Sequence, residues 1–526
     1  MKALVVDALA RGEGAKYATV DVVGAGPRVV AGLVKDLIDV NYVPYEVALT
    51  HELARYDYLL ISAMISDLGA VNTLVERANA KGFRGKVILG GPVSFGYWEI
   101  LFRMRRVDYV LIGEAEIPLP ILIKTIGEGG PIEKVPALAY RAGETIKVTS
   151  SHIHTPKEII SSVKPWTEVD KSYDKPQIYR FYVEVVRGCS NFYRPMIRGI
   201  GGLNCTECGN CRSKVLKDRV VCPAWIPPGC GFCSVPYMFG PPRSRSVKSV
   251  TMEVEELIAH GARRIVLSGP DFLDYGRDEI VNEPLTDPCN PPPNVEAIEE
   301  LLNMLYTIPE IANRKAVVMI ENIKACLVDE DVARLLGKYL SGTTVHIGME
   351  TGNDFFNEKV LGKPIGVRDV LRATKLLSKN GLRPYVYLMY GLPLMDKAVY
   401  ADTLNIIGEL AASGVEKITL YKFTPLPGTG FEKMGPEVSN HREEITLLKR
   451  RVESFNFTVK RKMVGQIVEA YLYNSEGKCV AYPLQHGPVI FLTRSDKCLG
   501  GCRALVKIVD IGVRKVIGRT VKVIEC

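Results

Sequence analysis

The stretch that decides the fold runs from residue 182 to residue 242. It begins with YVEVVRGC (182–189), continues through forty residues rich in cysteine, and includes PPGCGFCSVP (227–236). Seven of the thirteen cysteines of the chain lie within it. Disulfide scaffolds belong to short secreted chains, whereas this chain has 526 residues. Binding of a metal ion or a metal cluster therefore explains this density of thiols better.

Cys230 and Cys233 form a Cys-x-x-Cys turn, which brings two thiolates close enough to share one zinc ion or one iron–sulfur cluster. Cys189 stands at the end of a predicted buried strand, and it supplies a third ligand if the intervening residues loop out. Three protein ligands on a four-iron cluster leave one iron open. A small molecule can be chelated at that open iron.

These phrases resemble the radical S-adenosylmethionine (SAM) superfamily, whose usual motif is Cys-x3-Cys-x2-Cys with an aromatic residue before the last cysteine, as Phe232 is here. VEVVRGC is similar to the first barrel strand of that family, and RSRSVKSVTMEVEEL to the helix that follows the cysteines. The sequence departs from the motif because forty residues, not three, separate Cys189 from Cys230. The resemblance implies a 4Fe–4S cluster on Cys189, Cys230 and Cys233 that takes an electron from an external donor and cleaves SAM to a 5′-deoxyadenosyl radical.

The residues between these ligands contain a second set of cysteines. Cys205-x2-Cys208-x2-Cys211, followed by Cys222-Pro223, resembles the run of cysteines in bacterial ferredoxins, although the last gap is longer. We therefore expect a second 4Fe–4S cluster here. A structural zinc ion is the alternative, but such sites commonly use two separated Cys-x-x-Cys pairs.

Length and composition predict a protein of about two to four domains, with enough hydrophobic residues to form their cores. The net charge of +8 permits binding to nucleic acid or an anionic substrate without requiring it. No run of eighteen apolar residues occurs, and MKALVVDALARGEGAK at the N-terminus is unlike a signal peptide. We expect a cytoplasmic protein in a reducing compartment. The scarcity of glutamine beside many charged residues favours a thermophilic source.

Residues 1–150 alternate apolar runs with amphipathic segments, which predicts a doubly wound, Rossmann-like α/β domain. The predicted strands cover residues 3–7, 45–49, 58–63, 86–92 and 109–113, and the predicted helices lie near 27–41, 67–81, 94–105 and 117–126. A hairpin is expected at 137–148, with its turn at Gly143. ILGGPVSF and DYVLIGEAEIPLPILI are similar to the cobalamin-binding-like domain that precedes many radical SAM barrels.

Ligands of doubly wound sheets bind at the carboxyl ends of the strands, which here carry Ser62, residues 90–94 and residues 113–116. Cobalamin is one expectation for this edge. The domain has neither cysteine nor an Asp-x-His-x-x-Gly run to supply a histidine ligand to cobalt. Cobalamin bound without a protein ligand and a domain that only packs on the barrel both stay open.

A linker at 151–178 leads to a repeating β/α series over residues 179–456, interrupted by the cysteine-rich insert at 190–229. About six β/α units predict a partial (β/α)6 barrel of the TIM type. Its working face should be the carboxyl ends of the strands. There the family resemblance implies contacts to SAM, which it assigns to Ser268, Gly269, Pro270, Asp271, Glu350, Asn353 and Gly391, with Phe232 beside the cysteines.

Residues 457–526 show short alternating strands and predict a small β-barrel. The pattern resembles the TRAM domain, an RNA-binding module of methylthiotransferases, and its basic residues could meet phosphate. They are Lys460, Arg461, Lys462, Arg503, Lys507, Arg514, Lys515 and Arg519. A β-cap without RNA is the alternative. Cys289 and Cys326 could each donate a hydrogen atom or bind a cluster, but a lone cysteine in a core strand or loop is usually a small apolar residue. Cys498, Cys502 and Cys526 are expected to be free or paired thiols.

The resemblance implies an enzyme that uses the SAM-derived radical to functionalise an unactivated C–H bond. Three hypotheses follow for its role. The first is methyl or methylthio transfer, with RNA as the substrate if the last domain is TRAM-like. The second is a radical SAM enzyme that forms a carbon–carbon or ring bond in a lipid or small metabolite. The third is an iron–sulfur protein that binds RNA without catalysis. The sequence predicts no oligomeric state.

Overall fold

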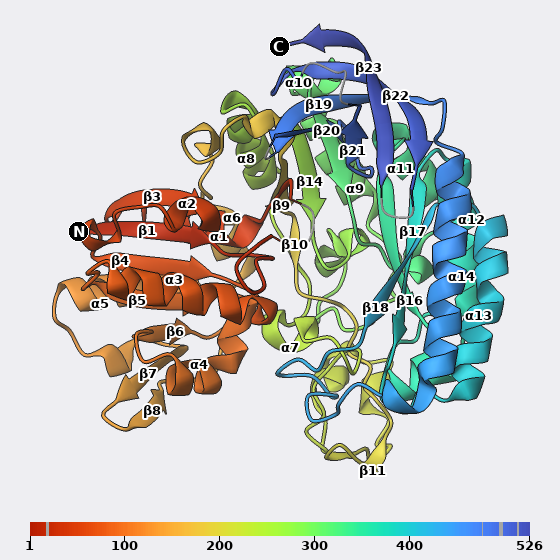
Figure 1. The fold of residues 1–526 in the computed structure, drawn as a ribbon. Coiled ribbons are helices and arrows are strands. Elements are labelled where there is room, and N and C mark those ends of the chain that lie inside the picture. The colour runs from red at the N-terminus through yellow and green to blue at the C-terminus, as the bar shows by residue number, and fades with distance from the viewer. Residues whose placement is uncertain (17–19, 476, 494–497, 513–514) are drawn as a thin grey trace. The chain divides into compact units, whose positions relative to one another are not determined.

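A computed structural model describes residues 1–526 apart from 17–19, 476, 494–497 and 513–514 (Figure 1). The chain divides into two compact units, each built from two stretches of sequence. The first unit holds Met1–Glu184 and Arg245–Ala262, and the second holds Val185–Ser244 and Arg263–Cys526. Among the described helices, none combines the length and the apolar character needed to cross a bilayer.

The first unit contains a seven-stranded sheet in the order β3-β1-β4-β5-β6-β7-β8. The strands from β3 to β6 pair in parallel, and β7 and β8 pair antiparallel at one edge. The strands are β1 Lys2–Asp7, β3 Asp39–Pro44, β4 Tyr58–Ser62, β5 Lys86–Gly90, β6 Tyr109–Leu111, β7 Leu138–Ala142 and β8 Thr145–Val148. The helices are α1 Ala25–Val34, α2 Tyr45–Ala48, α3 Leu68–Ala80, α4 Tyr97–Arg103, α5 Pro118–Gly127, α6 Lys157–Ser162 and α8 Val247–Ala259.

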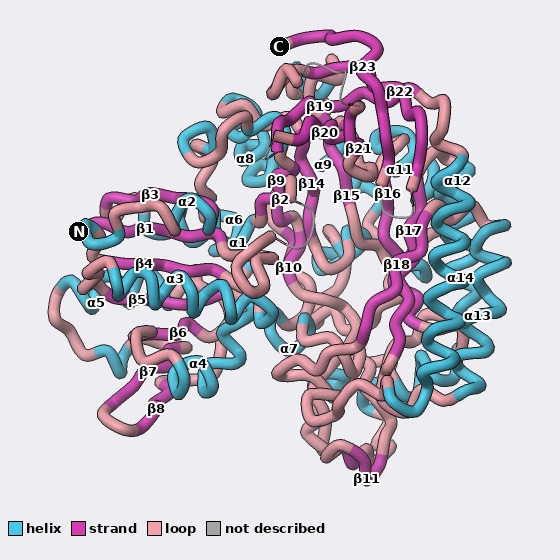
Figure 2. The backbone as a smooth tube through the Cα atoms, in the orientation of Figure 1, coloured by secondary structure: helices cyan, strands magenta, loops and turns pink. Residues whose placement is uncertain are grey.

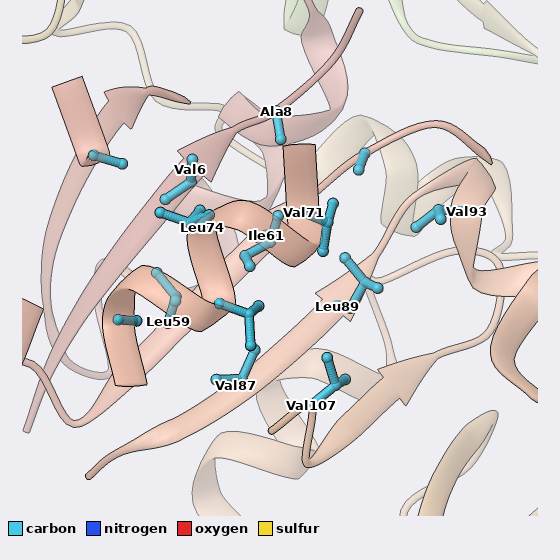
Figure 3. Packing of buried hydrophobic residues seen from close by; sticks show 14 of the residues in the cluster. Val6, Ala8, Leu59, Ile61, Val71, Leu74, Val87, Leu89, Val93 and Val107 are labelled. Atoms are coloured by element: carbon cyan, nitrogen blue, oxygen red, sulfur yellow. The ribbon is translucent and has the colours of Figure 1, made fainter. Parts of the chain in front are cut away.

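The parallel strands of the sheet are rich in apolar residues, as expected for strands that helices cover. Figure 3 shows Val6 of β1, Ile61 of β4 and Leu89 of β5 beside Val71 and Leu74 of α3. All five side chains are at most 2% exposed, and each such burial contributes about 1.5–3 kcal/mol. The doubly wound architecture predicted for this region is confirmed.

Two predicted elements of this unit are wrong. Residues 45–49 were predicted as a strand, but they begin helix α2, and the strand lies one run earlier, at Asp39–Pro44. Pro44 explains the change, because it has no N–H to donate to a ladder and is well tolerated where a helix starts. The helix predicted over 27–41 therefore ends at Val34. The hairpin turning at Gly143 is confirmed by β7 and β8.

The second unit contains a series of parallel strands that alternate with helices. The strands are β14 Arg264–Ser268, β15 Val317–Ile320, β16 Thr344–Glu350, β17 Arg383–Tyr390 and β18 Lys417–Lys422. β14 pairs with β15, a bridge from Asn322 to His346 links β15 to β16, and β17 lies between β16 and β18. The helices are α9 Val295–Leu305, α10 Pro309–Ala312, α11 Glu330–Leu340, α12 Val367–Lys379, α13 Lys397–Ala412 and α14 Arg442–Arg461.

These five strands and their helices agree with the predicted β/α series, and β9 (Arg180–Glu184), the strand that precedes Cys189, belongs to the first unit. Short elements complete the region around the cysteines. They are β10 Val186–Arg187, β11 Arg198–Ile200, β12 Leu203–Asn204, α7 Val235–Phe239 and β13 Arg243–Ser244. Long loops in this region lie around β11 in Figure 2. β2 (Val22–Val23) belongs to the first unit, where it pairs in parallel with β9.

The last part of the chain is a closed barrel in the order β19-β20-β21-β23-β22. Its strands are β19 Ile467–Ser475, β20 Lys478–Pro483, β21 Ile490–Leu492, β22 Arg503–Ile511 and β23 Val516–Glu525. The prediction of strands from residue 457 onward is wrong at its start, because α14 continues to Arg461. Val452 and Phe455 are buried at helical spacing, which extends the helix through a segment that alternates locally like a strand. Lys460 and Arg461 therefore belong to the end of a helix, and Lys462 follows it.

Six cysteines of the second unit form disulfides. The pairs are Cys289–Cys326, Cys479–Cys498 and Cys502–Cys526. The expectation that Cys289 and Cys326 are lone apolar residues is therefore wrong. Of the two possibilities left open for Cys498, Cys502 and Cys526, the structure has all three in disulfides. The seven free cysteines are the seven of the 182–242 stretch.

Candidate functional site

Cys189 follows β10, where the backbone passes close to the segment at Gly240 and Pro241. β10 pairs antiparallel with β13, and the Cys189 N–H donates to the Gly240 carbonyl at 3.0 Å. Gly188 has φ +90°, and a β-carbon there would lie 2.3 Å from the Pro241 carbonyl oxygen. Only glycine combines that conformation with that approach. The backbone therefore fixes where Cys189 lies relative to the segment that follows the other two cysteines.

Cys230 and Cys233 lie on one turn, in which the Cys233 N–H donates to the Cys230 carbonyl at 2.8 Å. Gly231 between them is held from both sides. Its N–H donates to the Leu361 carbonyl at 2.7 Å, and its carbonyl accepts the Phe431 N–H at 2.8 Å. Segments that are distant in sequence therefore hold the Cys-x-x-Cys turn in place.

Cys189 and Cys230 both contact Asn191, and Cys233 lies one turn after Cys230, although forty residues separate the first cysteine from the second. The Asn191 amide Nδ2 donates to Cys230 Sγ at 3.2 Å, and the Asn191 backbone N lies 3.5 Å from Cys189 Sγ. Burial raises the pKa of all three thiols. Burial together with the charges of the neighbouring cysteines raises the pKa of Cys230 to about 11 and that of Cys233 to about 12. A coordinated metal removes such protons. The donor set fits a cluster bound through three thiolates.

A buried ion pair lies beside the Cys-x-x-Cys turn. Lys363 Nζ is 2.7 Å from Glu350 Oε1, and both residues are less than a tenth exposed. Burial lowers the pKa of Lys363, but the charges of Glu350 and Cys230 outweigh that effect and raise it. Gly348 leaves room for the pair, since a β-carbon there would lie 2.5 Å from Glu350 Oε1. Glu350 itself has φ +66°, a conformation that a non-glycine residue rarely adopts.

A second charged network lies on the Cys189 side. Lys324 Nζ contacts Asp271 Oδ2 at 2.8 Å, Asp274 Oδ2 at 2.6 Å and Ser190 Oγ at 2.9 Å. Arg277 completes it through Asp274. Its two acids balance its two bases, which makes the burial of four charges tolerable. The charge of Lys324 also lowers the pKa of Cys189, against the larger effect of burial.

The residues predicted to contact SAM lie in several places. Ser268 ends β14, and its carbonyl accepts the Val185 N–H at 2.9 Å. Gly269 packs against Val186, and Pro270 follows it in the same loop. Asp271 is engaged by Lys324 and by two backbone N–H groups.

The other predicted contacts belong to later segments of the same unit. Glu350 ends β16, and Gly391 follows β17. Asn353 bonds internally, because its Nδ2 donates to Asp402 and its Oδ1 accepts the Phe356 N–H. Phe232 is half-buried between the two cysteines of the turn. A role of these residues in SAM binding stays a prediction.

Three of the four cysteines of the insert lie near one arginine. Arg194 is 3% exposed, and the charges of Cys222, Cys211 and Cys208 act on it. Cys205 is placed by its N–H, which donates to the Ile197 carbonyl at 2.9 Å. No three His, Cys, Asp or Glu side chains within the described ranges converge tightly enough for a single metal ion. A four-iron cluster is larger than one ion, and its ligands stand further apart.

The strand ends of the first unit are partly closed by the chain itself. Ser62 and Glu114 are both 4% exposed. Glu114 Oε2 accepts the Thr155 N–H at 3.0 Å, and the backbone of Gly113 is bridged to Ile153. At Gly90, in contrast, a β-carbon would meet nothing within 4 Å. Ser62 and Glu114 are thus buried, whereas the same edge is open at Gly90, and the binding of cobalamin there stays a prediction.

Sequence reasoning missed Asn191, Lys324 and Lys363. Asn191 stands two residues after Cys189, and an amide so near a ligand was a usable signal. Lys324 and Lys363 are 135 and 174 residues beyond Cys189 by their numbering. Nothing in their local sequence indicates that they lie beside the cysteines.

Comparison with known proteins relates the chain to one superfamily. Residues 227–407 match the radical SAM superfamily. An uncharacterized protein of Methanopyrus kandleri is 35% identical over 99% of this chain and 96% of its own length. The ribosomal protein uS12 methylthiotransferase RimO of Acetivibrio thermocellus is 30% identical over 118 residues, which cover 21% of this chain and 26% of that protein.

The radical SAM methyltransferase TsrM of Kitasatospora setae has a similar fold, with a TM-score of 0.59 at 13% identity, covering 82% of this chain and 75% of that one. The family match takes in Cys230 and Cys233 of the turn that the structure places beside Cys189. Membership implies one 4Fe–4S cluster and SAM as cofactors. The chain is thus a member of the radical SAM superfamily of enzymes.

Proposed function

We propose that the protein transfers a methyl or methylthio group to an unactivated carbon, using a radical made from SAM. The observation that carries the proposal is the meeting of Cys189, Cys230 and Cys233 as free thiols across a forty-residue insert. The likeness to a methyltransferase fold and to a methylthiotransferase sequence supports group transfer over other outcomes of the same radical.

The roles of the chain's own residues follow from their positions. Cys189, Cys230 and Cys233 would hold the cluster, while the Asn191 amide would donate to a ligand sulfur. When bound, the cluster and SAM supply the electron and the 5′-deoxyadenosyl radical that removes a substrate hydrogen. Lys363 with Glu350, and Lys324 with Asp271, would place charged groups around the zwitterionic methionine end of SAM. Ser268, Gly269, Pro270, Asn353 and Gly391 are proposed as further contacts.

Cobalamin separates the two forms of group transfer. TsrM was solved with cobalamin and a 4Fe–4S cluster bound, and a corrinoid here would favour methyl transfer. Because Ser62 and Glu114 are enclosed, no step in this proposal depends on a corrinoid. A cytoplasmic location is proposed as well, since oxygen-sensitive clusters need reducing surroundings.

The experiment uses protein purified without oxygen and SAM labelled in its methyl group. Cell extract is supplied as three separate fractions, namely RNA, ribosomal proteins and small molecules. Label in one fraction, together with 5′-deoxyadenosine, is the expected result, and mass spectrometry then distinguishes methyl from methylthio. The Cys230→Ala variant is the control and should transfer nothing. Formation of 5′-deoxyadenosine with no label in any fraction would contradict group transfer and favour bond formation within a metabolite.

A second candidate function is RNA binding by the C-terminal barrel. Lys507 of β22 lies directly opposite Arg519 of β23, and both side chains are exposed. Like charges that face each other across a strand pair repel and destabilise the sheet. An anionic ligand such as a phosphate backbone would offset this repulsion. Lys515 and Lys522 add charge on β23 or beside it. Arg514 lies outside the described residues.

A further inference from the structure

The insert, residues 190–229, is built around a buried arginine. The Arg194 guanidinium donates to four carbonyls, those of Phe192 at 3.0 Å, Arg219 at 2.7 Å, Val220 at 3.1 Å and Ile226 at 2.8 Å. Three of these carbonyls flank Cys222. The arginine therefore holds the segment of Cys222. Burial lowers the pKa of Arg194, and negative charge on the nearby Cys222, Cys211 and Cys208 opposes that effect. A buried cation among thiols suits a site that becomes negative when the thiols are ligands.

The insert is fastened to the rest of its unit. Arg219 lies 2.5 Å from Asp287 in a pair that is almost fully buried, and Arg212 lies 3.1 Å from Glu358. The Met196 N–H donates to the Lys359 carbonyl at 2.8 Å. These contacts fix the insert as a rigid part of the second unit.

A continuous path of contacts joins the two sets of cysteines. Asn191 Nδ2 donates to Cys230 Sγ at 3.2 Å and to the Gly362 carbonyl at 3.0 Å. Gly362 packs on the backbone of Arg194, where a β-carbon on the glycine would lie 2.7 Å from the carbonyl carbon. Two residues thus connect Cys230 with the arginine of the insert.

The outer surface of the insert is both apolar and basic. Trp225, three residues after Cys222, is 91% exposed, and Val221 and Val220 are 60% and 47% exposed. Of the six lysines and arginines of the insert, Arg194 and Arg219 are buried, which leaves four at its surface against the two acids Glu207 and Asp218. Lys214 and Lys217 are exposed beside the cysteines in sequence. Exposed apolar side chains with basic neighbours are typical of a docking surface, with tryptophan as its anchor.

We propose that the insert binds a second 4Fe–4S cluster and is the surface at which a small acidic one-electron carrier protein docks to reduce the enzyme. The inference rests on the proposed function, which consumes such an electron. One electron leaves the carrier, which is oxidised by one equivalent, and is consumed when the S–C5′ bond of SAM breaks to methionine and the 5′-deoxyadenosyl fragment. A basic surface attracts an acidic carrier and speeds their encounter, and salt weakens that attraction.

The metal content tests the first half of the proposal. Wild-type protein reconstituted without oxygen should hold about eight irons and eight sulfides per chain, the content of two four-iron clusters. The variant with Cys205, Cys208, Cys211 and Cys222 all changed to Ala should keep about four of each, as well as the circular-dichroism spectrum of the wild type. One zinc with four irons in the wild type would overturn the proposal. That measurement on the wild type does not depend on whether the variant folds.

The docking surface is tested with a purified clostridial-type ferredoxin of negative net charge as the probe. The variant Trp225→Ala with Lys214→Glu and Lys217→Glu should bind the ferredoxin at least tenfold more weakly by calorimetry. Its clusters should also be reduced by ferredoxin at least tenfold more slowly in stopped-flow absorbance. Titanium(III) citrate needs no docking surface and should reduce the variant at the wild-type rate. Ferredoxin affinity and reduction rate equal to those of the wild type would overturn the proposal.

Matched controls use residues elsewhere on the chain. Lys375→Glu with Lys379→Glu makes the same charge change on α12, where both residues are exposed, and Trp98→Ala removes another tryptophan, 61% exposed. These variants should behave as the wild type does, and an equal loss in them would overturn the assignment of the surface. The proposed function fails separately if titanium(III) citrate reduces the clusters but yields no 5′-deoxyadenosine. Ferredoxin binding and cluster reduction still decide the docking proposal in that case.

Discussion

Lys363 and Glu350 form a buried ion pair, and the charge of each partner is stabilised by the charge of the other. Changing Lys363 to Met leaves the Glu350 carboxylate buried without its cation, which should cost about 3–5 kcal/mol of unfolding free energy. The double variant with Glu350→Gln removes both charges and should recover most of that loss. Urea denaturation of the metal-free protein measures all three.

The exposed pair of Lys338 and Glu299 provides the matched control. Its side chains are 59% and 41% exposed, and removing such a surface pair costs at most about 1 kcal/mol. Lys338→Ala should therefore leave the unfolding midpoint nearly unchanged. A loss at Lys363→Met no larger than the loss at Lys338→Ala would show that the buried pair does not form.

At the scale of elements, Glu253 joins helix α8 to helix α1 within the first unit. It lies 2.7 Å from Arg28 and 2.6 Å from Arg245, and all three side chains are almost fully buried. Burial alone would raise the pKa of Glu253, but the two guanidinium groups outweigh it and lower the pKa. The resulting stability is present above the unfolded pKa of about 4.3 and is lost as the pH falls through the lower, folded pKa.

The variant Glu253→Gln should remove this pH dependence. At pH 7 it should cost about 3–5 kcal/mol, because two buried guanidinium groups lose their carboxylate. Below about pH 4 the difference from the wild type should shrink as the wild-type carboxyl is protonated. The measurement is the denaturant midpoint of the metal-free protein at several pH values. A difference that stays constant from pH 7 to pH 3 would contradict the assignment.

RNA binding is predicted at the strand pair β22 and β23. If Lys507 and Arg519 bind phosphate, the affinity for a single-stranded RNA should fall linearly with salt on logarithmic axes. The slope should shrink by about one for each of the two residues made neutral. Filter binding at several salt concentrations measures it, with Lys375→Gln and Lys379→Gln on α12 as the control. An unchanged slope in Lys507→Gln with Arg519→Gln would remove the RNA function from this surface.

Much of the fold was predictable because local patterns carry it. The apolar runs located four of the five predicted strands of the first unit, and the glycine at 143 located its hairpin turn. The strand predicted at 45–49 was wrong because a proline starts a helix there. The strand predicted at 457–461 was wrong because α14, with Val452 and Phe455 buried, continues through it. The cysteines proposed as ligands could be identified from their positions in the sequence. Lys324, Lys363 and the three disulfides were not, since only the folded chain brings those residues together.

For the molecule as a whole, the thirteen cysteines divide into two chemical groups. Seven are free and belong to the two proposed clusters, whereas six are paired. Disulfides are rare in the cytosol but common inside hyperthermophilic cells, which agrees with the composition of the chain. Metal-free protein denatured without reductant should therefore show seven reactive thiols, and thirteen after reduction. Thirteen thiols before reduction would contradict the pairing.

The central claim is that Cys189, Cys230 and Cys233 hold one cluster although the insert separates them. The most direct test is the formation of 5′-deoxyadenosine from SAM by anaerobic protein reduced with titanium(III) citrate, measured by liquid chromatography and mass spectrometry. The wild type and the control variant Cys289→Ala with Cys326→Ala should both form it. Cys189→Ala should form none and should lose about four irons, the content of one cluster, while the insert keeps its metal. Normal 5′-deoxyadenosine formation by Cys189→Ala would contradict the account.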